Sequence, residues 1–478
     1  MLHYAGVPIF TDMTKWRFQI FGEADNLVSL TMEEFRALPQ VTIARIRPGP
    51  AANQALVDVE VRPGRLPAAP NGKTSSPAYD LRLFRDGRLV AQWPEERDES
   101  PEEPDLPAWR ASHRLVPGRD GVVRHSFAVA LPANSGTIEF SAYAFNEDRV
   151  KSTTALAPYR HRSTQARAAR VFVIALGVDN YAEKRLRLHY AASDATLLGE
   201  RLAKLPDGTK PRVLVVADDG RAGGPRLTSQ ATHDIFAILG GAPRRPALAR
   251  LAALGIDAAM LDRATPDDTV LVSFSGHGWA DPQGAFYLLP AEAQWPDGTT
   301  PPVLSSLVSA ADMARQLRRI DAGEFALIID ACHSAASVDG QGFRAGPMGD
   351  AGLGQLAFDK QMRILAATQS DDVALESDRL GQGLLTYALA REGITDTGGQ
   401  ADENGDKVIT LDEWLRYGVN RLPALSRDPA LARPAGSPVA ARGVVFLSQA
   451  AAARRVQEPA LFDFTRRESD LIVRRVPQ

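Results

Sequence analysis

Hydrophobic and polar positions alternate in short runs along residues 41–157, which is the pattern of strands that bury one face. Clear examples lie at 55–61, 79–84 and 89–93, and the last two flank Asp86-Gly87. An Asp-Gly pair between two alternating runs predicts a tight hairpin turn. We therefore expect a small antiparallel β-sandwich in this part of the chain.

The pattern changes after residue 170, where continuous apolar runs alternate with amphipathic segments of helical period. Buried strands that alternate with helices predict a mostly parallel sheet covered on both faces. In such sheets the functional site lies beyond the carboxyl ends of the strands. The clearest predicted strands are 171–178, 212–217, 269–275 and 325–330, and the clearest predicted helices are 192–205, 306–320, 384–391 and 410–422.

These patterns divide the chain into five segments. Residues 1–40 have no readable role, 41–157 form the predicted β-sandwich, and 158–170 are a basic linker without periodicity. Residues 171–452 form the predicted α/β domain, and 453–478 are predicted to be a C-terminal tail. The length of 478 residues agrees with two domains rather than one.

The charge and the cysteine content of the chain limit the classes of partner and the cellular compartment that we expect. The chain has 55 basic and 58 acidic residues and a net charge of −3, so we expect no nucleic acid and no membrane surface as partner. One cysteine excludes an internal disulfide and indicates a reducing compartment. With no secretory or membrane-spanning segment in the sequence, we expect a cytoplasmic protein.

That cysteine, Cys332, stands where the apolar run 325–330 gives way to polar residues. His277 ends the run 269–275 in the same way, 332 − 277 = 55 residues upstream. A catalytic thiol needs a neighbouring imidazole that accepts its proton. Each residue alone is more often structural, the cysteine as a buried hydrophobe and the histidine as a turn residue. Their shared placement favours a nucleophile and its base.

Ordered motifs extend this pair. Ser275-Gly-His-Gly278 and Asp330-Ala-Cys-His-Ser334 resemble the histidine and cysteine motifs of caspase-like cysteine peptidases, above all metacaspases and prokaryotic caspase homologues. Further matching stretches are 176–181, 190–195, 366–370 and 383–386. The resemblance covers about 170–449. It implies an α/β fold, namely a caspase-like αβα sandwich with a mostly parallel six-stranded sheet.

The resemblance also implies catalytic roles. Cys332 would be the nucleophile and His277 the acid and base, with no cofactor required. The backbone N–H groups of Gly278 and Cys332 would form the oxyanion hole. The product would be a cleaved peptide bond in a protein substrate.

Substrate preference follows from the acidic residues at motif positions. True caspases carry glutamine two residues before the nucleophile, whereas this chain has Asp330 there. By resemblance, Asp330, Asp194 and Ser275 would form a pocket that binds arginine, and lysine second, because a carboxylate matches a guanidinium. The alternative is that Asp194 stabilises a helix N-terminus and Asp330 forms a turn.

The glycine-rich segment 334–360 resembles the linker between the large and small subunits of this family. Arg344 or Lys360 could then be a self-processing site in a zymogen, or a partner protease could cut the chain. A flexible loop without this role is the alternative.

Residues 402–413 resemble a calcium-binding EF-hand loop. The candidate ligands are Asp402, Asn404, Asp406, the Val408 carbonyl and Glu413. Lys407 occupies the position that needs glycine, so the alternative is a polar turn that caps the helix beginning near residue 410.

These observations predict a basic-residue-specific cysteine endopeptidase whose β-sandwich positions the protease or binds a protein partner. By family analogy alone, it would act in a prokaryotic stress, cell-death or antiviral-defence pathway. One alternative is a non-catalytic caspase-like scaffold that acts through protein binding. Another is a cysteine-dependent esterase or transacylase that uses the same two residues.

Overall fold

The computed structural model divides the chain after residue 166 into two compact units, which are described separately below. For residues 17–20, 28–31 and 351 it describes the backbone only. The described residues are 17–20, 28–31, 36–68, 72–95, 105–163, 165, 167–281, 285–295, 301–331, 351–367, 376–377, 379–428, 431, 457, 459–466 and 470–476.

Unit 1 contains two antiparallel sheets whose apolar residues form one core. The first has the order β11-β10-β7-β8, with β7 Tyr79–Arg85, β8 Arg88–Trp93, β10 Gly136–Phe145 and β11 Ala155–His161. The second has the order β3-β4-β9, with β3 Gln40–Pro48, β4 Gln54–Arg62 and β9 Val123–Ala130. The described residues of this unit also form two short strand pairs and one helix: β1 Arg17–Ile20 with β2 Val28–Thr31, β5 Gly64–Arg65 with β6 Ser75–Ser76, and α2 Leu106–His113.

The alternation of apolar and polar residues along the predicted strands appears in the structure as alternation of buried and more exposed side chains. Along β4 every second residue is buried, as expected for a strand with one face against a core. The hairpin predicted at Asp86-Gly87 is confirmed, because both residues have positive φ, 49° and 74°, between β7 and β8. Strand β11 continues to His161, so the sheet extends into the segment predicted as a linker, 158–170.

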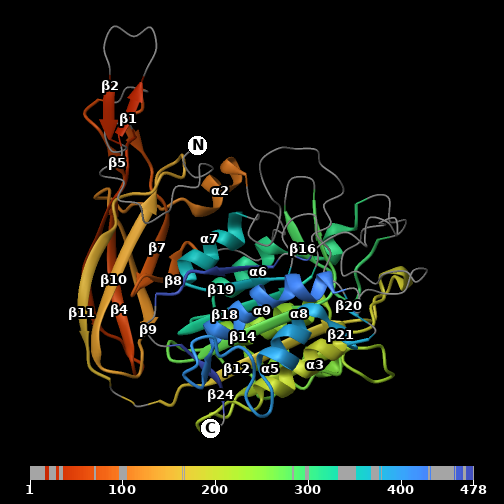
Figure 1. Cartoon of the computed structure of the whole chain (residues 1–478). Helices are drawn as coiled ribbons and strands as arrows, with labels where there is room; N and C mark the ends of the chain where they lie inside the picture. Colours follow the sequence, from red (N-terminus) through yellow and green to blue (C-terminus); the bar gives the residue numbers. More distant parts are fainter. Residues whose placement is uncertain are drawn as a thin grey trace. The chain divides into compact units, whose positions relative to one another are not determined.

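Unit 2 is built on a six-stranded sheet with the order β13-β12-β14-β18-β19-β23. Strands β12, β14, β18 and β19 of this sheet are labelled in Figure 1. The first five strands are parallel, and β23 pairs antiparallel with β19. The α/β fold with a mostly parallel sheet is therefore present. The strands are β12 Val171–Val178, β13 Arg212–Asp218, β14 Thr269–Ser275, β18 Glu324–Asp330, β19 Arg363–Ala366 and β23 Ala460–Asp463.

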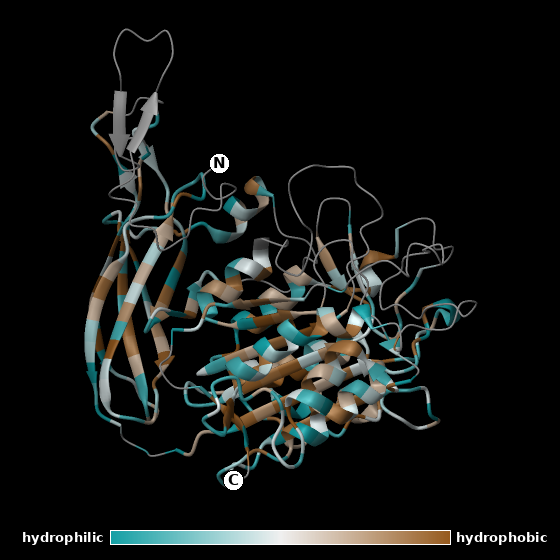
Figure 2. Cartoon of the chain, in the orientation of Figure 1, coloured by the Kyte–Doolittle hydropathy of each residue, from teal (hydrophilic) through white to brown (hydrophobic). Residues whose placement is uncertain are grey.

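Helices bury both faces of this sheet. Apolar colouring is concentrated on the strands between the helices in Figure 2. One core contains residues of α4 Ser229–Gly240, α5 Arg244–Ala253, α6 Ala310–Arg318 and α7 Ala351–Lys360. The other contains residues of α3 Ala191–Leu202, α8 Leu384–Tyr387, the following π-helix Ala388–Gly393 and α9 Leu411–Arg427. Two separate cores explain why the strands are apolar on both sides.

The end of the chain belongs to unit 2, which corrects the boundary predicted at residue 452. Strand β23 is the sixth strand of the sheet, and β24 Ile472–Arg475 pairs with β22 Val408–Thr410. Arg363, which is 5% exposed, holds this region by ion pairs with Glu324, Asp463 and Asp470. A long-range charge network, not a local pattern, therefore anchors the terminal segment.

Asp268 anchors the start of the sheet. Its side chain is fully buried and accepts hydrogen bonds from the Arg170 backbone and guanidinium and from Thr265. Burial alone would raise the pKa of Asp268, but the hydrogen bonds outweigh it and hold the pKa below its ordinary value of 3.8. The ionised form is thus the stable one in the folded chain.

We expect Asp268→Asn to lower the free energy of unfolding by about 3–5 kcal/mol at pH 7, because Arg170 loses its buried partner. A carboxyl whose pKa is lower in the folded state than in the unfolded state stabilises the fold at pH values above the unfolded pKa. This contribution to the free energy of unfolding is lost as the pH falls through the folded-state pKa. The difference from the parent should therefore shrink below about pH 4. Urea unfolding at several pH values measures it.

Asp262→Asn is the matched control, because Asp262 pairs with the same arginine but its side chain is 54% exposed. Its effect should stay within about 1 kcal/mol. A difference between Asp268→Asn and the parent that does not change with pH would contradict the ionised pair.

Candidate active site at the carboxyl edge of the sheet

The parallel register brings three strand ends into one row. Gly177 of β12 lies opposite Ser275 of β14, and Ser275 lies opposite Asp330 of β18. Ser275 is 1% exposed and Asp330 is 3% exposed. The Gly276 N–H donates to the Asp330 carbonyl at 3.2 Å, which carries the contact one residue past the strand. Two of the three predicted pocket residues are therefore neighbours.

His277 lies just beyond this row and is buried, with 4% of its surface exposed. Its Nε2 is 2.7 Å from the carbonyl oxygen of Leu186. A carbonyl oxygen only accepts, so Nε2 must carry the proton in the neutral imidazole. The lone pair is then on Nδ1, which makes Nδ1 the atom that can accept a proton.

Tyr181 holds the other side of His277. The backbone N–H of His277 donates to the Tyr181 hydroxyl oxygen at 2.8 Å. The two rings lie 5.0 Å apart between centroids, with an interplanar angle of 47°. Sequence reasoning assigned no role to Tyr181, although it follows β12 at the same edge. The direction of its hydroxyl depends on how the chain turns after the strand.

Of the other residues in the predicted mechanism, the structure describes Gly278 but not Cys332 or Arg344. Gly278 begins the short strand β15 Gly278–Ala280, which pairs with β16 Phe286–Leu288. Cys332 and Arg344 lie outside the described residues, which end on this side at Ala331. Their predicted roles therefore stay predictions.

Buried carboxylates surround the first turn of α3. Asp194 is fully buried, and its two oxygens accept from the Gly383 N–H at 3.0 and 3.2 Å. Asp179 accepts from the N–H groups of Ala191 and Ala192 at 2.8 and 3.2 Å. Negative charge at a helix N-terminus is stabilised by the free N–H groups and the helix dipole. The alternative predicted for Asp194, a carboxylate in the first turn, is thus part of what the structure shows.

Glu376 adds a third carboxylate to this turn. It accepts from the N–H groups of His189 and Tyr190 at 3.3 and 3.2 Å. Glu376 belongs to β20 Glu376–Ser377, which pairs with β21 Gln382–Gly383. Sequence reasoning missed both Asp179 and Glu376. The position of Asp179 directly after a strand was a usable signal, whereas Glu376 stands in no periodic pattern.

Lys360 differs from the expectation of an open linker. It ends helix α7, is 4% exposed, and its Nζ donates to the Ile320 carbonyl at 3.0 Å. Leu353, Leu356 and Ala357 of the same helix are buried in the core. In this conformation Lys360 is therefore covered and lies in a helix and not in an open linker, while cleavage there stays a prediction.

The oxygens predicted to bind calcium are occupied within their own loop. Asp402 accepts from the N–H groups of Gly405 and Lys407, and Asp406 accepts from Val408. Glu413 and Thr410 form a capping box at the start of α9. Within the described ranges no three His, Cys, Asp or Glu side chains are grouped to hold a metal ion.

These contacts are those of a loop without a bound ion, and they do not test calcium binding. They match the polar turn named as the alternative. One feature does agree with an EF-hand loop: Lys407 has a φ of +67°, the conformation for which that position needs glycine. Calcium binding by Asn404 and its neighbours stays a prediction.

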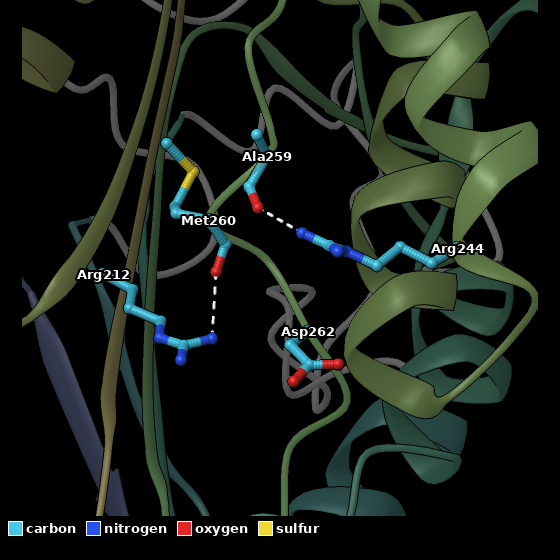
Figure 3. Close-up of a pocket in the computed structure, with 5 residues that line it drawn as sticks. All are labelled: Arg212, Arg244, Ala259, Met260 and Asp262. Atoms are coloured by element: carbon cyan, nitrogen blue, oxygen red, sulfur yellow. Dashed lines mark hydrogen bonds between the residues drawn. The ribbon is translucent and has the colours of Figure 1, made fainter.

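A cavity of about 380 Å³ is lined by residues of β13, of α5 and of the segment 259–262 (Figure 3). Arg212, which lines the cavity, begins β13, and the other end of this strand lies at the carboxyl edge of the sheet. Arg212 donates to the Met260 carbonyl, and Arg244 donates to the carbonyls of Ala259 and Leu261. The arginines thus hold the segment 259–261 against β13 and α5. The lining residues are Arg212, Arg244, Ala259, Met260 and Asp262.

Comparison with known proteins does not identify the chain. No family model and no curated protein matches it. One solved structure with partial similarity is the protein YxiM from Bacillus subtilis, at 11% identity over 62% of this chain and 69% of that one. Its TM-score of 0.14 is too low to support any inference about fold or function. None of the described helices has the length and apolar character needed to cross a membrane.

We expect nitrogen NMR of the imidazoles to show His277 as the Nε2–H tautomer near neutral pH, because Leu186 offers only an acceptor. A His277→Gln variant assigns the signal. His233, which is partly exposed on α4, serves as the internal reference. An Nδ1–H tautomer would contradict the Leu186 contact.

Proposed function

We propose that unit 2 is a caspase-like cysteine endopeptidase that cleaves protein chains after arginine and, less efficiently, after lysine. Cys332 is the nucleophile, and His277 is the acid and base. The observation that carries the proposal is the parallel register of β14 and β18, because the two catalytic motifs follow these neighbouring strands. The sheet also agrees with the sandwich implied by the resemblance, with five parallel strands and an antiparallel sixth.

The state of His277 supports its role as base. Leu186 keeps the proton on Nε2, so Nδ1 can take the proton of the Cys332 thiol as the sulfur attacks the scissile carbonyl carbon. The same proton then passes to the leaving amine, and a thioester remains. Water hydrolyses this thioester with His277 again acting as base, which frees the carboxylate product and the thiol. The N–H groups of Gly278 and Cys332 stabilise the oxyanion in both steps.

The acidic residues support a preference for a basic side chain. Asp330 and Ser275 are adjacent and buried, and Asp194 is fully buried at the start of α3. A buried carboxylate repels an aspartate side chain but pairs strongly with a guanidinium, which forms two parallel hydrogen bonds. In this proposal the substrate arginine displaces water from the row of strand ends and places its carbonyl beside Cys332.

Regulation by cleavage completes the proposal. The chain is made as a precursor, and a cut at Arg344, by the enzyme itself or by a partner protease, activates it. Unit 1 binds a partner protein or positions the protease. Placement in a prokaryotic stress, cell-death or antiviral-defence pathway rests on the family resemblance alone.

A non-catalytic caspase-like scaffold is the alternative proposal, in which the β-sandwich of unit 1 binds other proteins. A cysteine-dependent esterase or transacylase would use the same dyad on a different acyl donor. The ordered contacts of His277 with Leu186 and Tyr181 favour an enzyme, because a scaffold has no need for a fixed tautomer.

We expect the purified chain to hydrolyse fluorogenic peptides that end in arginine, with lysine second and with aspartate or alanine near background. Cys332→Ala should abolish this turnover, because the thiolate forms the covalent intermediate. Initial rates before and after limited proteolysis measure the activity of both the precursor and the cut form.

Two results would count against this proposal in different ways. No thiol-dependent turnover in either form would favour the scaffold. Thiol-dependent cleavage after aspartate would keep the peptidase but overturn the arginine pocket.

We expect Asp330→Asn to lower kcat/KM for arginine peptides by about 100-fold or more, because the substrate cation loses a buried partner. Asp219→Asn is the matched control, since Asp219 follows β13 at the same edge but is exposed. Circular dichroism and urea unfolding report folding. If Asp330→Asn loses stability in proportion to activity, Asp330 has a structural role instead.

A further inference from the structure

The Tyr181 hydroxyl makes a contact that the proposed chemistry does not use. Tyr181 is 1% exposed, and its oxygen accepts the His277 N–H at 2.8 Å. A Cβ placed on Gly276 would lie 2.9 Å from this hydroxyl oxygen. The hydroxyl is therefore pressed against the backbone between Ser275 and His277, where the chain leaves the sheet.

We propose that Tyr181 is a positioning residue, whose hydroxyl fixes the position of His277 relative to the strand ends. The inference rests on the proposed function. It goes beyond the proposed function by assigning the alignment of the base to Tyr181, which has no part in the proposed chemistry.

The geometry supports this because both ends of His277 are held by one short segment. Tyr181 holds the backbone N–H and one face of the ring, and the Leu186 carbonyl holds Nε2. The imidazole is thus located with respect to the chain after β12, in addition to its own strand β14. Without the hydroxyl, the buried N–H of His277 would lose this acceptor, and the chain would shift to recover one.

The segment that supplies these contacts is itself fixed. The N–H groups of Asp179 and Asn180 donate to the Asp218 carbonyl at 2.9 and 3.1 Å. Ala182 donates to the Ala291 carbonyl at 2.8 Å, and Leu188 donates to the Asp179 carbonyl at 3.1 Å. Such bonds make residues 179–188 a rigid support, which a residue that positions another requires.

Tyr181→Phe tests the inference because it keeps the ring and removes one oxygen. We expect kcat per active site to fall by about 10- to 100-fold, since a small misplacement of the base slows proton transfer. KM should stay within about twofold, because the substrate pocket is untouched. Active sites are counted with a thiol-directed inhibitor, so a loss of folded enzyme does not count as a loss of kcat.

Tyr417→Phe is the matched control. The Tyr417 hydroxyl bonds to Glu392 and Gln400 beside α9, so this variant removes a hydroxyl from the same unit but not from the site. Its kcat per active site should equal that of the parent. If Tyr181→Phe behaves like Tyr417→Phe, the hydroxyl only fills the core and the inference is overturned.

A second measurement separates this inference from the proposed function. In Cys332→Ala, hydrogen exchange of the His277 amide should be slow, and Tyr181→Phe should accelerate it. Unchanged exchange would overturn the contact even if the parent cleaves peptides. Accelerated exchange in a chain whose parent shows no thiol-dependent turnover would instead refute the function and, with it, the catalytic role of the contact.

Discussion

The parallel register across β12, β14 and β18 is the constraint on which the rest of unit 2 depends. These parallel strands are paired in register along their length, so their carboxyl ends lie side by side at one edge of the sheet. This is why Ser275 and Asp330 are neighbours although 55 residues separate them (330 − 275). Gly177 of β12 lies opposite Ser275 in the same row. This position requires glycine, because a Cβ there would lie 2.1 Å from the Ala191 carbonyl oxygen. The first turn of α3 can therefore pack directly against the end of β12.

Gathering polar groups at a buried edge has an electrostatic cost, since carboxylates lose water there. Backbone N–H groups offset this cost at the start of α3, where Asp179, Asp194 and Glu376 all accept from them. At the same edge, burial raises the pKa of Asp218, because the loss of water outweighs the hydrogen bond from the Leu227 N–H and the charge of Arg226. The candidate site thus lies in a region whose charges are held in place by the main chain.

Sequence reasoning reached the parts of this arrangement that local pattern determines. The eight apolar residues of β12 identified a strand buried on both faces, and the predicted bounds, 171–178, are those observed. It did not identify β23, because four residues of mixed polarity become a strand only through pairing with β19 and the ion pair of Asp463 with Arg363. Local pattern carries no information about such a distant partner.

The same distinction applies to the candidate site. His277 could be chosen from its place after an apolar run, whereas Tyr181 and the Leu186 carbonyl could not, because their roles depend on the path of the chain between β12 and α3. Lys360 was placed in a linker because glycines precede it. The buried Leu353 and Leu356 instead make the second part of that segment a core helix.

These contacts also bear on the proposed activation. The parts of unit 2 before and after residues 334–350 are joined by the pairing of β18 with β19, by the Arg363–Glu324 ion pair, and by the Asp194–Gly383 hydrogen bonds. A cut at Arg344 would remove none of these bonds. The two fragments would therefore stay associated, with Ser275, Asp330 and the first turn of α3 kept in place. The pairing of β14 with β18 and the contacts of His277 with Leu186 and Tyr181 would therefore outlast such a cut.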